Sequence, residues 1–150
     1  MKAREQELRE KQIKALLVKK EQEVAATVKE QQRQESKEKY QAKLDEWAME
    51  KGGEKKNIRT LLSTVGIERG MHQVMWEGAD FQPISLAQLL QPEKVKLYYR
   101  KAMLKVHPDK NRDGTPDQIY IAQRIFEALN QAWATFQDQQ KYMINPFEMI

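Results

Sequence analysis

The residues with the clearest chemical potential are the consecutive His107, Pro108, Asp109 and Lys110. An imidazole can donate and accept a hydrogen bond, a carboxylate accepts, and an ammonium group donates. These groups could bind polar groups of a partner, but they contain no nucleophile beside a base and cannot hydrolyse a substrate alone. We therefore interpret the tetrapeptide as a site that acts on a partner, and we predict no catalytic residues and no enzyme activity.

Two amphipathic helices are predicted on either side of this tetrapeptide. Pro108 disfavours the helical conformation at the residue before it, so the helix that contains residues 95–106 must end at His107. Residues 110–116 are rich in turn formers, which predicts an exposed loop. Thr115 and Pro116 are a typical N-cap and first helical residue, followed by a Gln three residues after the cap. The tetrapeptide should therefore lie at the tip of a helical hairpin.

Apolar residues at spacings of three and four predict the faces on which the two helices of the hairpin pack. In the first helix these residues are Val95, Tyr99, Ala102 and Val106; in the second, over residues 117–137, they are Ala122, Ile125, Phe126, Leu129, Trp133 and Phe136. Leu97 and Leu104 lie roughly opposite the core face of the first helix. Since a leucine left in water forgoes ~1.5–3 kcal/mol of burial, we expect residues 71–81 to cover these two side chains.

Residues 1–50 contain neither Gly nor Pro, and their 12 basic and 11 acidic residues nearly cancel. This composition predicts a charged helix, and its thin apolar stripe favours a solvated single helix over a sustained coiled coil. Gly52 and Gly53 should end it, which places a domain boundary near residue 50. Trp47 is unusual in such a helix and is a candidate for packing on the following segment. A second short helix is predicted around Ile58, Leu61, Leu62 and Val65.

Composition excludes several classes of protein and of site. No run approaches the ~18 apolar residues of a membrane-spanning helix, and residues 1–12 are charged, so we expect neither membrane insertion nor a signal peptide. The chain has no cysteine, which excludes disulfides and thiolate chemistry. Its two histidines are far apart in the sequence, so we predict no metal site and no cofactor. A cytosolic or nuclear location is the default for such a chain.

The formal net charge of +4 is concentrated between Pro92 and Lys110. This stretch holds six basic residues against two acidic ones, and the basic set is Lys94, Lys96, Arg100, Lys101, Lys105 and Lys110. Such a patch attracts an acidic partner, which could be nucleic acid or an acidic protein surface.

The pattern around the tetrapeptide resembles a J domain of the DnaJ type. The sequence YRKAMLKV (99–106), the HPDK tetrapeptide (107–110) and a following helix with Phe126, Leu129 and Trp133 carry this resemblance. More narrowly, NIRTLLSTV (57–65), the cluster around Trp76, FQPI (81–84) with SLAQLL (85–90), and LNQAWATF (129–136) resemble the auxilin subfamily. The resemblance covers about residues 45–138.

This resemblance implies an all-α fold. A J domain with a long antiparallel helical hairpin would carry the extra N-terminal helices and loop of the auxilin type, and an extended charged helix would precede it. The expected division is a charged extension or linker over residues 1–50, the J domain over 54–138 and a C-terminal tail over 139–150.

The implied function is that of a co-chaperone that binds a 70-kDa heat-shock chaperone and stimulates its ATPase. In the auxilin subfamily this chaperone dismantles clathrin coats, which implies a cytoplasmic protein at clathrin-coated vesicles. Carried over to this sequence, His107, Pro108 and Asp109 are the activating motif, and the six basic residues form the docking face. No clathrin-box pattern is found, so clathrin is expected as a partner by resemblance alone.

The tail holds Asn145, Pro146 and Phe147, the tripeptide that EH domains of endocytic proteins bind. The alternative is that this tail folds back onto the domain. For the whole chain, one alternative function is a J domain for a different client, with residues 1–50 as the adaptor. A second makes the basic helix a nucleic-acid contact. It is disfavoured because the helix carries the HPDK turn and has no aromatic side chain free for stacking.

Overall fold

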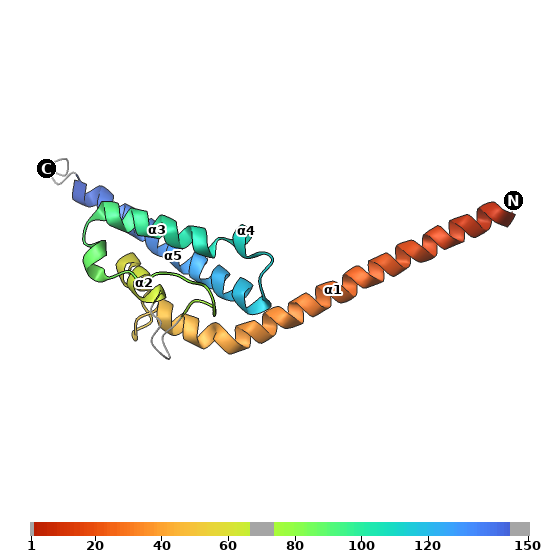
Figure 1. The fold of residues 1–150 in the computed structure, drawn as a ribbon, viewed down its shortest axis with the longest axis horizontal. Coiled ribbons are helices and arrows are strands. Elements are labelled where there is room, and N and C mark those ends of the chain that lie inside the picture. The colour runs from red at the N-terminus through yellow and green to blue at the C-terminus, as the bar shows by residue number, and fades with distance from the viewer. Residues whose placement is uncertain (1, 67–73, 145–150) are drawn as a thin grey trace. The chain divides into compact units, whose positions relative to one another are not determined.

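The computed structural model describes residues 2–66 and 74–144 of the chain. In chain order its helices are α1 (Lys2–Ala48), α2 (Ile58–Val65), the 3-10 helix η2 (Leu86–Leu89), α3 (Pro92–Val106), α4 (Pro108–Asn111) and α5 (Pro116–Ile144), as Figure 1 shows. Neither of the two described ranges contains a strand, and the predicted all-α fold is confirmed. Residues 145–147 of the tail and the first residues of the 71–81 segment lie outside the described ranges.

The chain divides into two compact units, residues 1–35 and residues 36–150. Over residues 2–35 the first unit is part of α1. Its apolar side chains are exposed, as expected for a solvated helix; they are Leu8, Ile13, Leu16, Leu17, Val18, Val24 and Val28. All the sites discussed below lie in the second unit.

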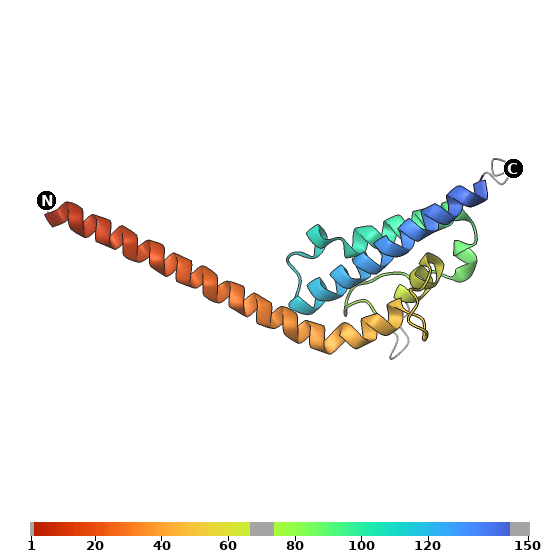
Figure 2. The same cartoon turned by 180° about the vertical axis from the view of Figure 1, so that it is seen from behind.

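The second unit is built around the predicted hairpin of α3 and α5, whose antiparallel course can be followed in Figure 2. The expected core face of α3 is confirmed, since Val95, Ala102 and Val106 are fully buried. Tyr99 completes this face by stacking on Trp133 of α5, with ring centroids 4.5 Å apart and planes 9° apart. Such stacking adds about 0.5–1.5 kcal/mol beyond the area buried. The two helices of the hairpin are thus packed together along this face.

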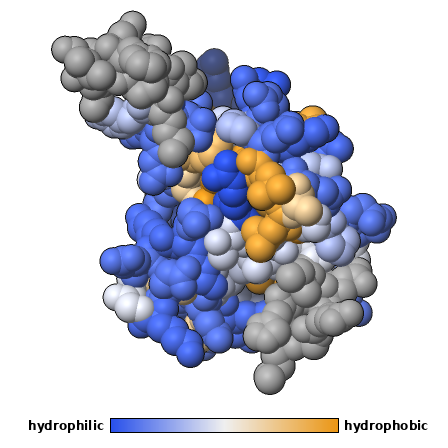
Figure 3. Space-filling model, turned by 90° about the vertical axis from the view of Figure 1, so that its left-hand side faces the viewer, coloured by the Kyte–Doolittle hydropathy of each residue, from blue (hydrophilic) through white to orange (hydrophobic). Residues whose placement is uncertain are grey.

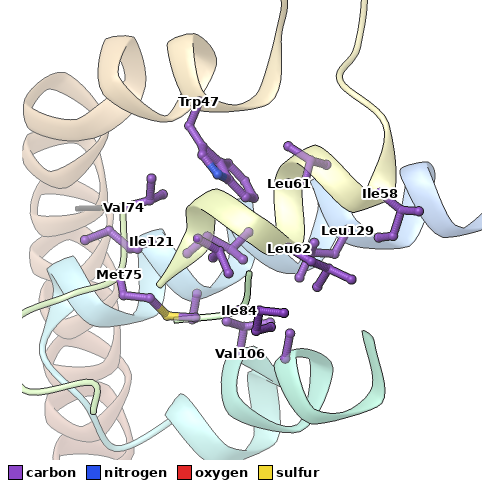
Figure 4. Packing of buried hydrophobic residues seen from close by; sticks show 14 of the residues in the cluster. Trp47, Ile58, Leu61, Leu62, Val74, Met75, Ile84, Val106, Ile121 and Leu129 are labelled. Atoms are coloured by element: carbon purple, nitrogen blue, oxygen red, sulfur yellow. The ribbon is translucent and has the colours of Figure 1, made fainter. Parts of the chain in front are cut away.

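The end of α1 and all of α2 cover the hairpin from one side. Figure 4 shows the Trp47 side chain extending from α1 towards α2, whose four apolar residues are buried as predicted. The Trp47 indole N–H donates to Thr64 Oγ1 at 2.9 Å, and Leu44 is 2% exposed. Because these side chains belong to the core, the packed unit begins at Ser36, earlier than the boundary that composition places near Gly52.

Side-chain caps set where the helices begin. Asn57 accepts from the Thr60 N–H at the start of α2, and Ser85 forms a capping box with Gln88 at η2. Thr115 Oγ1 accepts from the Gln118 N–H at 3.1 Å, so α5 begins where the sequence predicted. Its C-terminal end, at Ile144, lies beyond the predicted end near residue 137. The start of α5 matters for function, because it fixes the position of the residues that follow the hairpin tip.

The prediction that residues 71–81 cover Leu97 and Leu104 on the outer face of α3 is wrong. Leu97 and Leu104 are 42% and 57% exposed. Of the segment expected to cover them, Val74 and Met75 are buried in the core instead, near Ile121 and Val106 in Figure 4. Inside the core these apolar side chains lose nearly all their contact with water, which stabilises the fold more than a partial cover would.

Hydrophobic surface also remains at the end of the unit that carries η2. Leu86 and Leu90 are 59% and 73% exposed. Figure 3 looks at this end and shows an orange area bordered mostly by hydrophilic surface.

Candidate functional site

The tip of the hairpin is a sharp turn that Pro108 and its neighbours impose on the backbone. α3 ends at Val106, and His107 takes an extended conformation (φ −59°, ψ 133°), as expected for a residue before proline. Pro108 then occupies the first position of α4, where its missing N–H costs nothing. We call His107, Pro108 and Asp109 the HPD turn. Residues 108–111 form a short helix, so residues 110 and 111 of the predicted exposed loop are helical.

The His107 ring is held between its own backbone and α5. Its Nδ1 accepts a hydrogen bond from the Asp109 N–H at 3.2 Å, and its edge meets the Phe126 ring at 84° with centroids 5.8 Å apart. Because Nδ1 acts as an acceptor here, Nε2 is the ring nitrogen that carries the proton in the neutral imidazole. With 45% of its side chain exposed, His107 can offer this N–H to a partner.

Asp109 presents its carboxylate at the surface. Its side chain is 72% exposed, and its Oδ1 accepts from Arg112 at 3.1 Å. An exposed pair three residues apart contributes little to stability, typically less than ~1 kcal/mol. The carboxylate is therefore oriented while it stays accessible to a polar group of another molecule.

Asn111 ties the HPD turn to both long helices. Its side-chain amide donates to the carbonyl of Lys105 at 3.0 Å and to the carbonyl of His107 at 2.8 Å. Its Oδ1 accepts from Gln118 Nε2 of α5 at 2.8 Å. The residue is 3% exposed. Its amide supplies a donor to the Lys105 carbonyl at the end of α3 and a second donor to the His107 carbonyl, which also accepts from the Lys110 N–H at 3.1 Å. We call Asn111 and Gln118 the amide clamp.

Sequence reasoning treated Asn111 as turn chemistry and missed this role. The available signal was an asparagine five residues after the last residue of a helix, which can reach back to the carbonyls at the end of that helix. Gln118 was recognised only through its place after the N-cap.

The start of α5 is fixed in turn by α1. Asp117 accepts from Ser36 Oγ at 2.7 Å, from the Tyr40 hydroxyl at 3.3 Å and from Lys39 Nζ at 3.4 Å. The Ser36 hydrogen bond is the main reason that the pKa of Asp117 is lowered from its ordinary 3.8, and Lys39 and Tyr40 act in the same direction. Burial, followed by the charge of Asp117, raises the pKa of Tyr40 above 10.0. Further along α5, Arg124 is paired with Asp45 of α1.

The six predicted docking residues do not form a single face. By helical periodicity Lys94, Lys101 and Lys105 lie on one flank of α3, and Lys96 and Arg100 lie on the other. The exposed leucines at 97 and 104 run between the two flanks. Lys110 follows the HPD turn on α4, next to the first flank. The basic charge is thus divided by an apolar stripe, which the sequence pattern already indicated.

No group of three or more His, Asp or Glu side chains that could hold a metal ion occurs within the described part of the chain. Within residues 2–66 and 74–144, no helix has the length and apolar character needed to cross a bilayer. The predicted EH-domain ligand, Asn145, Pro146 and Phe147, lies outside the described residues.

Comparison with known proteins agrees with the helical hairpin and the HPD turn at its tip. The family model of the DnaJ domain matches residues 82–144, which include α3, the HPD turn and α5. Together with the helical hairpin and the motif at its tip, this match defines a J-domain protein.

Proteins with similar sequences indicate a subfamily within the J-domain proteins. Auxilin-related protein 1 of Arabidopsis thaliana is 34% identical over 145 residues, which cover 93% of this chain and 15% of that protein. An auxilin-like clathrin uncoating factor of Saccharomyces cerevisiae is 32% identical over 98 residues, covering 65% of this chain and 13% of that protein. A J-domain-containing protein of Arabidopsis thaliana required for the chloroplast accumulation response is 34% identical over 97 residues, covering 63% of this chain and 14% of that protein.

The chain is a J-domain protein of the auxilin subfamily. It spans about one seventh of the length of the curated relatives it matches. The similarity to the Arabidopsis auxilin-related protein covers almost the whole chain and is not confined to the DnaJ domain.

Proposed function

We propose that this protein binds a 70-kDa heat-shock chaperone in its ATP-bound state and stimulates hydrolysis by that chaperone. The observation that carries the proposal is the HPD turn at the tip of the hairpin of a J domain. The His107 Nε2–H and the Asp109 carboxylate form an exposed hydrogen-bond donor and acceptor that cannot catalyse a reaction alone. What such a pair can do is bind one conformation of a partner better than another and so shift its equilibrium.

In this proposal the six basic residues of α3 and α4 dock the chaperone. Five of them are exposed and Lys105 is half-buried, so their charge is available to an acidic surface. Exposed charges mainly raise the rate of association and lose this effect as salt increases. Docking and activation are then separate tasks: the basic residues bring the chaperone in, and the HPD turn acts on it.

The amide clamp supports this division of labour. A turn that is already ordered before binding spends none of the binding energy on its own ordering. More of that energy can then go into the change in the chaperone. DnaJ-domain proteins form a co-chaperone family and not a family of catalysts, so the bond-breaking chemistry is assigned to the partner.

We further propose that the activity serves the uncoating of clathrin-coated vesicles in the cytoplasm, with clathrin as a partner. The support is the similarity to a yeast protein described as an auxilin-like clathrin uncoating factor. The alternative is that the same J domain serves a different client, with residues 1–50 as the adaptor. That possibility is raised by the similarity to a J-domain protein required for a chloroplast response. EH-domain proteins are proposed as partners of residues 145–147 on the sequence alone.

Substitution of His107 tests the activating role. His107→Gln should abolish stimulation of the chaperone ATPase in single-turnover measurements. The fold should survive, because the side chain is 45% exposed and its loss removes one edge contact and one hydrogen bond. Asp113→Asn, in the same exposed loop, is the matched control and should stimulate normally. Equal stimulation by wild type and His107→Gln at equal thermal stability would refute the assignment.

Co-sedimentation with assembled clathrin cages tests the proposed coat. The full chain should pellet with the cages at moderate salt and stay in the supernatant without them. If it stays in the supernatant in both cases while it stimulates the chaperone, the function reduces to that of a J-domain co-chaperone for a different client.

A further inference from the structure

A surface hollow of about 610 Å³ lies between the end of α1, the N-terminal part of α2 and α5. From α5 it is lined by residues spaced by three and four, such as Ala128, Gln131 and Thr135, which share one face of the helix. Trp133, which stacks on Tyr99 of α3, belongs to another face. Among the described residues, no member of α3 or α4 lines the hollow. It is therefore separate from the basic residues assigned to chaperone docking.

Three cations line the hollow without a carboxylate partner. Lys55 Nζ and Lys56 Nζ donate to neutral oxygens, the side-chain oxygen of Gln131 at 2.7 Å and the main-chain oxygen of Glu46 at 3.2 Å. Arg59 Nε likewise donates to a main-chain oxygen, at 2.8 Å. Over the described part of the chain, no carboxylate lies within ion-pair distance of these three side chains. The hydrogen bonds orient the cations and leave their charge uncompensated.

The other charged groups of the hollow do not offset this excess. Arg124 is paired with Asp45 of α1. Glu127 is the one carboxylate among the described lining residues. A concave surface lined mainly by one sign of charge concentrates the electric field and attracts ions of the opposite sign. The hollow therefore favours an anionic occupant.

Apolar side chains make up the base of the hollow. Ile58, Leu61 and Phe136 are buried there, and Ala132 is partly buried. Met49 also lines the hollow and is 42% exposed, and its flexible side chain can adapt to apolar groups of different shape. Covering this surface gains free energy only if the occupant brings apolar atoms. The favoured occupant thus combines acidic and apolar side chains.

A peptide fits these properties better than a compact anion or a nucleic acid. Lys55 is bonded to Gln131, whereas the Arg59 guanidinium lies 5.2 Å from the centroid of the Phe136 ring. These two positions are separated by about 7.5 Å along α5, so carboxylates on different residues of a peptide can reach both cations. Base stacking is disfavoured because the ring of Phe136 is 6% exposed.

We propose that this hollow docks an acidic peptide segment with apolar side chains, from a protein other than the chaperone. The inference goes beyond the proposed function, because it adds a surface that stays accessible while the chaperone occupies α3 and the HPD turn. α5 separates the two surfaces, since one of its faces packs on α3 and another lines the hollow. The J domain can then hold the chaperone and a second protein at the same time.

Binding of a synthetic peptide tests the chemistry of the hollow. The probe is a fluorescently labelled peptide of repeated Glu-Glu-Leu units, and its anisotropy is measured with the full chain. The peptide should bind, and its affinity should fall as salt increases. Replacing its glutamates by glutamine, or its leucines by serine, should weaken binding about tenfold. Equal binding of the serine peptide would make the hollow a general anion site and overturn the proposal.

Charge reversal between α1 and α2 locates the peptide. Lys51 and Lys55 are both exposed, but only Lys55 lines the hollow. Lys55→Glu should weaken peptide binding about tenfold, and Lys51→Glu less than about threefold. Lys101→Glu, on α3, should also change the affinity less than about threefold. A loss of binding confined to Lys101→Glu would place the peptide on α3 and refute the assignment.

A second matched pair, on α5, tests the apolar lining. Ala132 lines the hollow, and Ala134 is exposed outside it. Ala132→Glu should weaken peptide binding more than about tenfold, because it places a carboxylate on the apolar surface, and Ala134→Glu should leave binding unchanged. If Ala132→Glu lowers the thermal stability, Met49→Ser at the exposed edge takes its place. Equal binding by the variants inside and outside the hollow would overturn the proposal.

The chaperone itself separates this surface from the proposed function. With the purified 70-kDa heat-shock chaperone and ATP at saturation, the affinity for the peptide should change less than about twofold. Displacement of the peptide would show that the chaperone uses the hollow, against the proposal. If the chain fails to stimulate the chaperone but binds the peptide in a manner that Lys55→Glu weakens, the proposed function fails and the docking surface stands.

Discussion

A chain that begins at residue 36 should fold, whereas a chain that begins at residue 50 should not. The shorter chain loses Leu44 and Trp47, which are 2% and 6% exposed, together with the Trp47 hydrogen bond to Thr64. It also loses the Arg124 partner Asp45. The longer chain keeps all of these contacts and omits only the solvated part of α1.

The magnitude follows from the cost of emptying two core positions. Leu→Ala in a core costs about 2–5 kcal/mol and Trp→Ala about 3–5 kcal/mol. Together these losses amount to about 5–10 kcal/mol, which is most or all of the ~5–15 kcal/mol that stabilises an ordinary domain. Removing the whole helical segment, with its hydrogen bonds and its ion pair, cannot cost less.

Urea unfolding followed by far-ultraviolet circular dichroism is the assay. Residues 36–150 should unfold cooperatively with a free energy close to that of the full chain, and residues 50–150 should show no cooperative transition. Leu44→Ala and Leu17→Ala in the full chain form a matched pair, since Leu17 is 55% exposed and its loss should cost less than about 0.5 kcal/mol. A cooperative transition for residues 50–150 within about 2 kcal/mol of the longer chain would refute the reasoning.

Two further predictions concern the polar contacts around the hairpin tip. Asn111→Ala removes three hydrogen bonds, among them the one to the Lys105 carbonyl at the end of α3, so the free energy of unfolding in urea should fall by about 2–4 kcal/mol and amide exchange at residues 107–112 should accelerate. Unchanged exchange would show that the clamp does not hold the turn. Asp117→Asn should destabilise the chain at pH 6 by less than about 1 kcal/mol, because the carboxylate is partly exposed. Since folding lowers the pKa of Asp117 below 3.8, the contribution of this carboxylate is present above that pH and is lost as the pH falls through the folded-state pKa. The difference between wild type and variant should therefore shrink at pH 3; a difference that grows on acidification would contradict the assignment.

Local rules were enough to predict the hairpin and its tip. Proline acts on the residue before it, and a Thr-Pro pair is a typical helix start, so the ends of α3 and the start of α5 follow from nearest neighbours. The apolar spacing of α2 and α5 likewise needs no knowledge of the partner helix. These features place His107 and Asp109 together at one turn.

What the sequence did not predict depends on contacts between distant segments. Leu44 and Trp47 lie in a charged helix whose composition is that of a solvated one, and only their burial against α2 shows that the packed unit begins before them. The periodicity of α3 shows that Leu97 and Leu104 face outwards but not whether another segment covers them. Asn111 looks like any turn residue until α5 brings Gln118 within hydrogen-bond distance.

The amide clamp has a consequence for how freely this site can vary. On α3 and at the turn, Asn111 binds the main-chain oxygens of residues 105 and 107 and none of their side-chain atoms. Every amino acid carries the same carbonyl group, so the clamp accepts any residue at these two positions that the backbone allows. Asn111 thus holds the backbone of the turn, whereas residues 105 and 107 supply the side chains that the turn displays. Charge at residue 105 can be reversed while Asn111 keeps its hydrogen bonds to the turn. Replacing the ring at residue 107 removes the hydrogen bond from the Asp109 N–H and the contact with Phe126 but leaves those of Asn111. Variants at 105 and 107 should therefore report mainly on recognition and little on folding.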